Sequence, residues 1–329
     1  MKINKPVMIT LSIAMLVALI FPAGACSTAI TYKPSTLPSR IAFSSDRDNT
    51  VHIYTVKPDG TDNRSTNNND SQILDGLPAW SPDGKVLAFS SNQADDYDIW
   101  IMEEDGSNRL RLTQLQGWDG LPRWSPDGSK ITFVGERRDT EGIGNLEIFL
   151  MYANGENIKN LTGDERHKSQ SSEEHTHSDI IKWDSCPTFS PDGQKILFAS
   201  NRDDATKPVL YIMNTDGSGQ KKFGWPFEID GTDADWSPVT NKIVFCRGSA
   251  AQGEIWVMDG GSPFPWLTAK KITDNSYNNC NPVWSPDGTQ IAFVSDTYGN
   301  DDIFIMNADG TNVRRLTYEK SNERHPTWR

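Results

Sequence analysis

The residues best suited to metal chemistry lie in one polar stretch of the chain. His175 and His177 stand there beside Glu173, Glu174 and Asp179. Imidazole and carboxylate groups at this spacing can coordinate a divalent cation. Because the stretch lacks apolar anchors, a solvated segment without fixed ligand geometry is the simpler interpretation. We therefore expect no metal and no other cofactor, and the alternative is a divalent cation held by acidic residues at a channel mouth.

The sequence also lacks the motifs of common catalytic centres. It has no Gly-x-Ser-x-Gly elbow, no phosphate-binding loop, no Gly-x-Gly-x-x-Gly, no Cys-x-x-Cys and no His-Glu-x-x-His. The three cysteines after Cys26 have no disulfide-framework spacing, so we expect no essential disulfide. Lys and Arg number 32 against 44 Asp and Glu, and the formal charge of -12 is opposite in sign to a nucleic-acid-binding surface.

The first residues must be set aside before the fold is interpreted. Two lysines precede an almost unbroken apolar run over residues 7–21, and small residues lead up to Cys26. This layout is typical of a signal peptide, since the run is shorter than the roughly 20 residues of a membrane-spanning helix. The small residues before Cys26 resemble the bacterial lipobox. We expect a signal peptide over residues 1–25, lipid attachment at Cys26, and a location in the periplasm or at the cell surface. Simple secretion with an incidental thiol is the alternative.

An internal repeat dominates the rest of the chain. Copies of Trp-Ser-Pro-Asp-Gly, some of them varied, place an aromatic residue at positions 80, 124, 189, 236, 284 and 328. These positions are separated by 44, 65, 47, 48 and 44 residues. A period in the mid-forties with one insertion is typical of propeller blades. We expect the insertion over residues 163–183, in a loop.

Each repeat carries the same series of short strands. An alternating apolar segment such as Ile131-Thr-Phe133 follows the motif, and a third strand and an Asp-Gly or Asn-Gly turn come next. In Ser-Pro-Asp-Gly, proline presets the first turn residue and glycine accepts the left-handed conformation that closes a hairpin. We predict an all-β fold over residues 40–329, a six-bladed propeller of four-stranded antiparallel blades. The motif is structural, with its aromatic residue packed between neighbouring blades.

The two ends of this region complete one blade. The first repeat begins at Ile41-Ala-Phe43 without the strand that should precede it, whereas His325-Pro-Thr-Trp328 is such a strand with nothing after it. We expect these strands to pair, closing the ring and removing its exposed edges. Residues 26–39 remain as a tether.

The repeat resembles that of a known family. Pro-x-Trp-Ser-Pro-Asp-Gly followed by Ile-Ala-Phe, an Ile-Tyr-like pair, Asp-Gly and Leu-Thr is similar to the WD40-like repeat of TolB-type β-propellers, from about residue 40 to residue 329. The resemblance implies the fold but leaves several functions open, since such propellers occur in periplasmic TolB, in oligogalacturonate lyases and beside peptidase domains. TolB has an N-terminal domain before its propeller, whereas only residues 27–39 stand here between Cys26 and the first blade.

Candidate binding residues lie where loops enter the innermost strands. The loops that join one blade to the next surround one channel mouth, and variable loops on a rigid scaffold commonly carry binding specificity. The candidates are Asp75, Trp118, Asp119, Arg123, Asp184, Asp230, Asp233, Asp235, Asn279, Asn281, Glu323 and His325. Their carboxylates would form a collar that focuses negative potential and favours basic partners. Turn chemistry inherited with the repeat is the alternative. Trp225 and Trp266 are further candidate aromatic contacts.

Two functions are consistent with these features. The first is a non-enzymatic, envelope-anchored monomer that binds protein or peptide partners, as TolB-type propellers do, with membrane contact through the lipid anchor only. The second is a carbohydrate-active enzyme resembling oligogalacturonate lyases, which the family resemblance implies would hold a metal with several channel histidines. Only Arg123 and His325 suit a channel site of that kind, and the other histidines cluster in one loop. The sequence therefore favours the binding scaffold.

Overall fold

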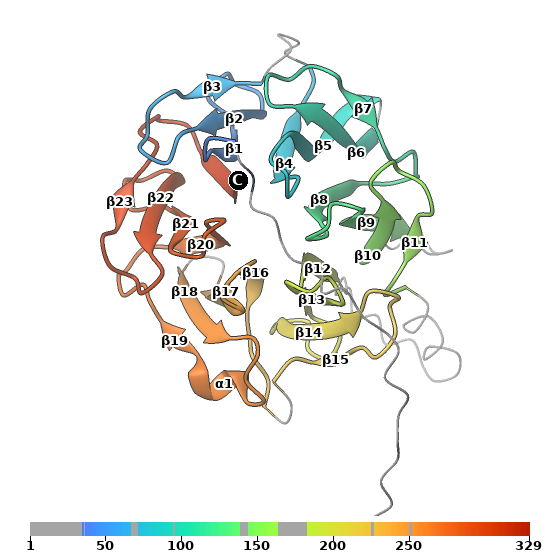
Figure 1. The fold of residues 1–329 in the computed structure, drawn as a ribbon, viewed down its shortest axis with the longest axis vertical. Coiled ribbons are helices and arrows are strands. Elements are labelled where there is room, and N and C mark those ends of the chain that lie inside the picture. Colours follow the sequence, from blue (N-terminus) through green and yellow to red (C-terminus); the bar gives the residue numbers. More distant parts are fainter. Residues whose placement is uncertain are drawn as a thin grey trace, which may run out of the picture.

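The computed structural model describes residue 35 and residues 37–66, 72–94, 96–138, 144–163, 183–224, 227–249 and 252–329. Six four-stranded antiparallel sheets surround a central channel (Figure 1), which confirms the predicted six-bladed propeller. The predictions for the signal peptide, for Cys26 and for most of the insertion at 163–183 fall outside the described residues. Among the described residues, no helix is long and apolar enough to cross a membrane.

Each blade runs from an innermost strand outward, as the strand labels in Figure 1 show. Blade 1 contains β24 (Glu323–Trp328), β1 (Ile41–Ser45), β2 (His52–Val56) and β3 (Arg64–Ser65). Blade 2 contains β4 (Asp75–Trp80), β5 (Val86–Ala94), β6 (Asp96–Glu103) and β7 (Leu110–Arg111). Blade 3 contains β8 (Asp119–Trp124), β9 (Lys130–Arg138), β10 (Gly144–Tyr152) and β11 (Lys159–Asn160). Blade 4 contains β12 (Asp184–Phe189), β13 (Lys195–Ser200), β14 (Val209–Asn214) and β15 (Lys221–Lys222). Blade 5 contains β16 (Thr232–Trp236), β17 (Lys242–Ser249), β18 (Gln252–Asp259) and β19 (Lys270–Lys271), with the short helix α1 (Pro265–Thr268) before β19. Blade 6 contains β20 (Asn279–Trp284), β21 (Gln290–Ser295), β22 (Asp302–Asn307) and β23 (Arg314–Arg315).

The repeated motif forms the turn between the first two strands of a blade. In blade 2 the Ser81 amide donates to the Val86 carbonyl at 2.8 Å, and the Gly84 amide donates to the Ser81 carbonyl at 2.8 Å. The Asp83 carboxylate accepts the Ser81 hydroxyl at 2.7 Å, and Gly84 has a φ of 71°. We call the side of the ring that carries these turns the turn face, and the opposite side the loop face.

Buried side chains between neighbouring blades form the core. Each second strand contributes a phenylalanine that is 0 or 1% exposed: Phe43, Phe89, Phe133, Phe198, Phe245 and Phe293. The motif aromatic joins these contacts, since Trp80 of blade 2 packs with Ala42 and Ile53 of blade 1. Burying an aromatic side chain of this size contributes about 1.5–3 kcal/mol each. The prediction that the motif aromatic packs between blades is confirmed.

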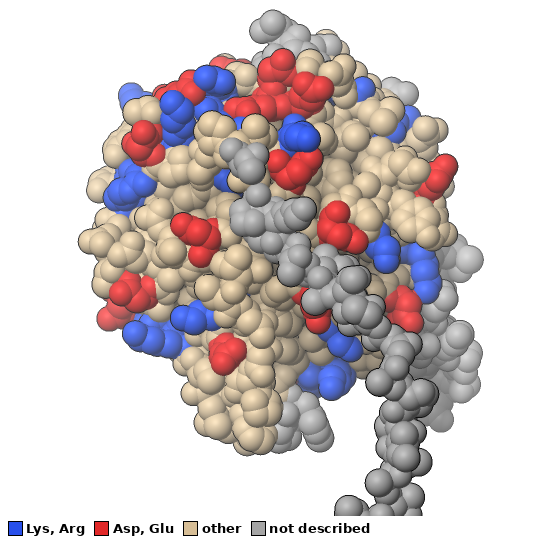
Figure 2. All heavy atoms as spheres, viewed as in Figure 1, with Lys and Arg blue, Asp and Glu red and all other residues tan. Residues whose placement is uncertain are grey.

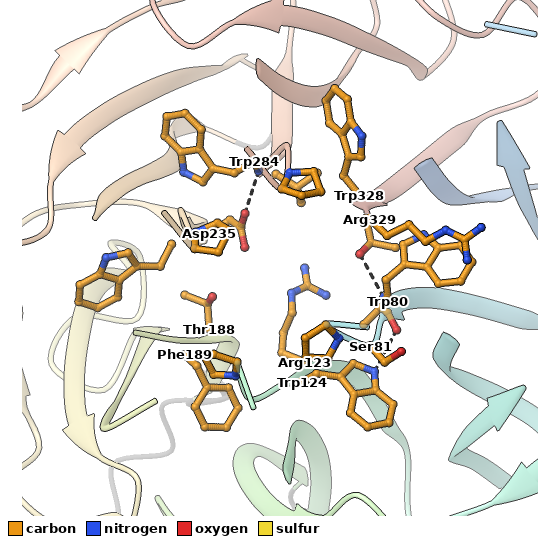
Figure 3. A pocket seen from close by; sticks show the side chains of 18 of the residues that line it. Trp80, Ser81, Arg123, Trp124, Thr188, Phe189, Asp235, Trp284, Trp328 and Arg329 are labelled. Carbon is orange, nitrogen blue, oxygen red and sulfur yellow. Dashed lines mark hydrogen bonds between the residues drawn. The ribbon is translucent and has the colours of Figure 1, made fainter. Parts of the chain in front are cut away.

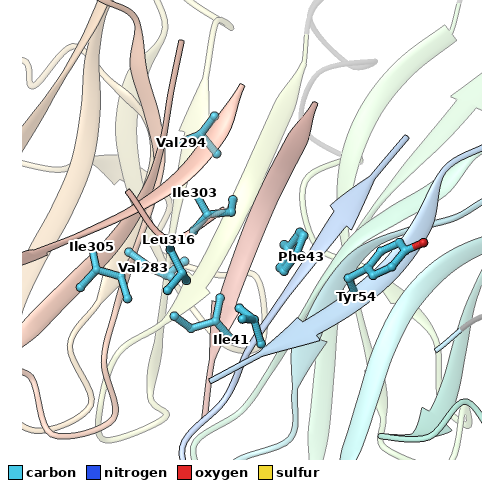
Figure 4. Packing of buried hydrophobic residues seen from close by; sticks show 10 residues of the cluster. Ile41, Phe43, Tyr54, Val283, Val294, Ile303, Ile305 and Leu316 are labelled. Atoms are coloured by element: carbon cyan, nitrogen blue, oxygen red, sulfur yellow. The ribbon is translucent and has the colours of Figure 1, made fainter. Parts of the chain in front are cut away.

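The ends of the chain close the ring as expected. β24 pairs antiparallel with β1, with Ile41 opposite Trp328 and Ser45 opposite Glu323. The amides of Arg40 and Arg329 donate to each other's carbonyl oxygens at 3.1 and 3.0 Å. Blade 1 then packs on blade 6, and Figure 4 shows side chains of both blades in one buried cluster. Sheet hydrogen bonds therefore join the two ends of the described chain.

Candidate functional site

Two rings of side chains line the channel. The innermost strands contribute one residue each to both rings. The residue just before each motif aromatic forms the mouth ring, nearer the turn face: Ala79, Arg123, Thr188, Asp235, Val283 and Thr327. The residue two positions earlier forms the floor ring: Leu77, Leu121, Cys186, Asp233, Asn281 and His325. The structure thus brings together five predicted site residues: Arg123, Asp233, Asp235, Asn281 and His325.

A backbone bulge in every innermost strand turns the floor ring inward. The pairing register with the second strand shifts in all six strands between the predicted collar position and the mouth ring. All six floor-ring residues have φ between 47 and 56°. This left-handed conformation is unusual for a residue such as Leu77 or Cys186, and a bulge commonly redirects a side chain next to a functional site.

The mouth ring forms the base of a cavity of about 150 Å³ that reaches the turn face. We call this cavity the funnel. Its rim is largely apolar and includes the motif aromatics and the prolines of five turns: Pro82, Pro126, Pro191, Pro238 and Pro286. Figure 3 shows the side chains of Arg123 and Asp235 pointing into the funnel from different blades.

The two charged side chains of the funnel are not paired with each other. Among the described residues, no carboxylate oxygen lies within 4.0 Å of the Arg123 guanidinium, whose Nη1 donates to the Pro122 carbonyl at 3.1 Å. One carboxylate oxygen of Asp235 accepts the Trp284 amide at 2.8 Å. Burial raises the pKa of Asp235 to about 6, and Arg123 opposes that shift. A ligand in the funnel can therefore meet a guanidinium and a carboxylate that are both available.

The floor ring encloses a cavity of about 20 Å³, which has room for about one water molecule. There the Cys186 thiol donates to an Asp233 oxygen at 3.2 Å. Burial raises the pKa of Cys186, so the sulfur stays a protonated thiol and lacks the reactivity of a thiolate. The His325 Nδ1 is buried without a hydrogen-bond partner, and burial lowers the pKa of this imidazole to about 4. This constriction limits the depth of the funnel and does not form an activated nucleophile.

We expect the buried His325 to make stability fall in mild acid. Its pKa is about 4 in the folded chain and 6.5 for the free group, so between these values the unfolded state binds more protons. Stability from the neutral imidazole is thus fully present above pH 6.5 and lost as the pH falls towards 4, by up to about 3 kcal/mol. His325→Asn suits the left-handed backbone, and Asn281 occupies the same position in blade 6.

Denaturant unfolding at pH 7.0 and pH 4.5 measures this effect. The difference in unfolding free energy between the two pH values should be smaller in His325→Asn than in the wild type. Asp119 and Asp235 also titrate near pH 6 and act with the opposite sign, but both are present in the two proteins. Equal pH dependence in the two proteins would mean that the imidazole is protonated as readily when folded as when unfolded.

The predicted acidic collar does not line the channel. Asp75, Asp119, Asp184 and Glu323 are at most 1% exposed, and each forms an ion pair with an arginine of its own blade. The partners are Arg109, Arg137, Arg202 and Arg47, at 2.8, 2.9, 2.9 and 3.0 Å. Asp230 is more exposed and pairs with Arg247 at 2.8 Å. The idea that these carboxylates present free negative charge is therefore wrong, because burial and neutral pairing remove it.

The arginines of these pairs also stack on aromatic rings of the same blades. The guanidinium of Arg47 lies 3.9 Å from the Tyr54 ring centroid, and that of Arg137 lies 4.4 Å from the Phe149 centroid. Blade 6 lacks both charges of the pair, since Asn279 takes the collar position and bonds to Asn275 and to the Tyr277 carbonyl. The joint loss of acid and arginine in one blade is what a structural pair predicts.

The remaining sequence candidates are separate from the channel rings. Trp118 is partly buried, and its ring lies against Gly120 at the start of β8. Trp266 is partly buried in the core of blade 5, and Trp225 falls outside the described residues. A partner contact at Trp118 stays a prediction. The described ranges contain no group of three or more His, Cys, Asp or Glu residues arranged to hold a metal ion, and the His175 and His177 stretch lies outside them.

Sequence reasoning missed Thr188, Cys186 and the proline rim of the funnel. A proline two residues before the motif aromatic recurs as Pro78, Pro122, Pro187, Pro282 and Pro326. Proline in an inner strand marks a bulge or another interruption of the hydrogen-bond ladder. This signal could have located the bulge, and with it the residues that face the channel.

The closed ring of six blades, with a motif aromatic between neighbouring blades and a polar channel, defines a β-propeller binding scaffold. The model of the TolB beta propeller domain matches residues 68–183 and 234–329. The chain belongs to this family.

Individual relatives match smaller parts of the chain. The uncharacterized peptidase YuxL of Bacillus subtilis (strain 168) is 32% identical over 114 residues, which are 32% of this chain and 16% of the relative. The Tol-Pal system protein TolB of Anaeromyxobacter dehalogenans (strain 2CP-C) is 34% identical over 82 residues, which are 23% of this chain and 19% of that protein. The chain thus matches less than a fifth of the length of either curated relative.

The solved structure of TolB from Acinetobacter baumannii has a similar fold. It matches with a TM-score of 0.67 and 22% identity, over 88% of this chain and 66% of that one. Identity at this level shows the fold alone.

Proposed function

We propose that this chain is a non-enzymatic, extracytoplasmic propeller that binds a protein or peptide partner through the funnel on its turn face. The observation that carries the proposal is the funnel itself, about 150 Å³ in volume, with Arg123 and Asp235 unpaired at its base. A mostly apolar cavity with a few convergent polar groups is the usual form of a binding site. The family and its Tol-Pal relative support a scaffold role.

The chemistry of the channel supports binding without catalysis. Cys186 is held as a thiol by burial, and the described channel residues lack a hydroxyl or thiol paired with an activating base. Relatives in this family include a peptidase, but the matching segment of 114 residues is propeller sequence without a Gly-x-Ser-x-Gly elbow. For location, the charged start, the apolar run over residues 7–21 and the small residues before Cys26 support export and lipid attachment.

Peptide selection on the full chain tests the funnel as a binding site. Peptides from a displayed random library that bind the wild type are measured against the double variant Arg123→Gln/Asp235→Asn. We expect the double variant to bind about 10- to 100-fold more weakly, because each lost charged hydrogen bond is worth about 1.5–3 kcal/mol.

A matched double variant controls for the general change in charge. Lys85→Gln/Glu156→Gln removes one positive and one negative charge from exposed turn residues outside the funnel lining. It should bind the selected peptides as the wild type does. Equal affinity of all three proteins would place the binding site elsewhere on the propeller.

A further inference from the structure

The charges around the channel favour a cation at its base. Arg123 contributes one positive charge, and Asp233 and Asp235 contribute two negative charges. His325 is neutral at pH 7 because its pKa is about 4. The two rings therefore carry one net negative charge, which an ammonium group would neutralise and a carboxylate would double. The low dielectric constant of a buried site strengthens this preference.

Asp235 is the carboxylate that a ligand in the funnel can reach. Asp233 lies deeper, in the floor cavity of about 20 Å³, and already accepts the Cys186 thiol at 3.2 Å and the Thr232 hydroxyl at 3.0 Å. Asp235 lines the funnel, and the Trp284 amide fixes one of its oxygens at 2.8 Å. Figure 3 shows this carboxylate directed into the funnel.

The rest of the funnel suits the chain that carries such a group. Ala79, Val283 and the turn prolines make much of its wall apolar, which fits the aliphatic part of a peptide end or of a lysine side chain. Thr188 occupies the mouth ring between Arg123 and Asp235 and offers a hydroxyl. Arg123 is two blades from Asp235, where it can donate to a carbonyl oxygen of the same ligand.

We infer that the funnel recognises the primary ammonium group of a peptide, with Asp235 as its acceptor. This inference rests on the proposed binding function and specifies its ligand. The ammonium comes from a chain N-terminus or from a lysine side chain. Only the N-terminus carries a carbonyl close to the ammonium, so Arg123 contributes to the binding of an N-terminus and not to that of a lysine.

Three small probes separate the two sources. Trialanine amide carries a free N-terminal ammonium, N-acetyl-trialanine amide carries none, and N-acetyl-lysine amide carries only the side-chain ammonium. Binding to the full chain is followed by tryptophan fluorescence, since Trp124 and Trp328 line the funnel and are partly exposed. We expect saturable binding of at least one ammonium-bearing probe and about 10-fold weaker binding of the acetylated trialanine.

Variants assign the acceptor. Asp235→Asn keeps an oxygen for the Trp284 amide and should weaken the ammonium probes about 10-fold, whereas Glu156→Gln, an exposed control, should not. Arg123→Gln should weaken trialanine amide only. Wild-type binding should also weaken below pH 6 as Asp235 becomes protonated, and this pH dependence should be absent from Asp235→Asn.

The outcomes distinguish this inference from the proposed function. If library-selected peptides lose affinity in Arg123→Gln/Asp235→Asn but tolerate acetylation of every amine, the funnel binds peptides and the ammonium inference is wrong. If trialanine amide and its acetylated form bind equally, the inference is also wrong. If neither the probes nor the selected peptides respond to any funnel variant, both proposals are wrong.

Discussion

Deleting His325–Arg329 should abolish cooperative unfolding of the propeller or lower its thermal midpoint by about 10 °C or more. The deletion removes Thr327 and Trp328, which pair with β1, and the reciprocal bonds between Arg40 and Arg329 at 3.1 and 3.0 Å. It also removes the Arg329 guanidinium that stacks 4.1 Å from the Trp80 centroid of blade 2. Blade 1 would lose most of its inner strand and expose an edge that the ring normally protects. Calorimetry or circular dichroism of both proteins measures the change.

A circular permutant provides the matched control. Arg329 and Arg40 occupy the places of Ser81 and Val86 in blade 2, so the ring is open only where a Ser-Pro-Asp-Gly turn would stand. Joining Arg329 to Arg40 through Pro-Asp-Gly-Lys, with new ends between the exposed Tyr298 and Gly299, should preserve or raise the midpoint. A deletion variant that melts like the full chain would show that pairing of the two ends does not hold the ring closed.

Replacing Arg137 by methionine should destabilise the fold by about 3–5 kcal/mol at pH 7. Asp119 is 0% exposed and pairs with Arg137 at 2.9 Å. Without that guanidinium, the carboxylate would be a buried and uncompensated charge. Burial already raises the pKa of Asp119 to about 6 despite Arg137, so the remaining carboxyl would accept a proton more readily. The loss should therefore be smaller at pH 5 than at pH 7, as urea unfolding at both pH values would show.

The double variant Arg137→Met/Asp119→Asn controls for the lost packing of the arginine on Phe149. Because it removes both charges, it should recover most of the stability that Arg137→Met loses. A loss below about 1 kcal/mol in the single variant would instead be typical of a solvent-exposed ion pair. That result would reopen the interpretation of the collar as an accessible electrostatic surface.

The repeat made the fold predictable because its signals are local and recur six times. The Ser-Pro-Asp-Gly turns need particular residues for backbone reasons, and the apolar strands alternate with a period of two. Closure followed from counting strands, since Ile41-Ala-Phe43 lacked a partner and His325-Pro-Thr-Trp328 was one. None of these inferences required side-chain positions across the ring.

The site was less predictable because one extra residue reverses the alternation. Without a bulge, Asp75, Leu77 and Ala79 would all face the channel. The register shift between Gly76 and Ala79 instead turns Asp75 into the blade, where Arg109 meets it at 2.8 Å. Arg109 is 34 residues from Asp75 in sequence, and spacing alone does not reveal such a partner. Arg123, Asp235 and His325 lie after the shift and face the channel as expected.

Photo-crosslinking from each face most directly tests the claim that partners bind at the funnel. A benzophenone amino acid replaces Val239, 50% exposed in a turn at the funnel rim, or Tyr298, 62% exposed between β21 and β22 on the loop face. Each full-chain variant is irradiated with a library-selected peptide, and the adducts are measured by mass spectrometry. We predict adducts from position 239 and none from position 298. Adducts from position 298 alone would contradict the account and return partner binding to the loop face.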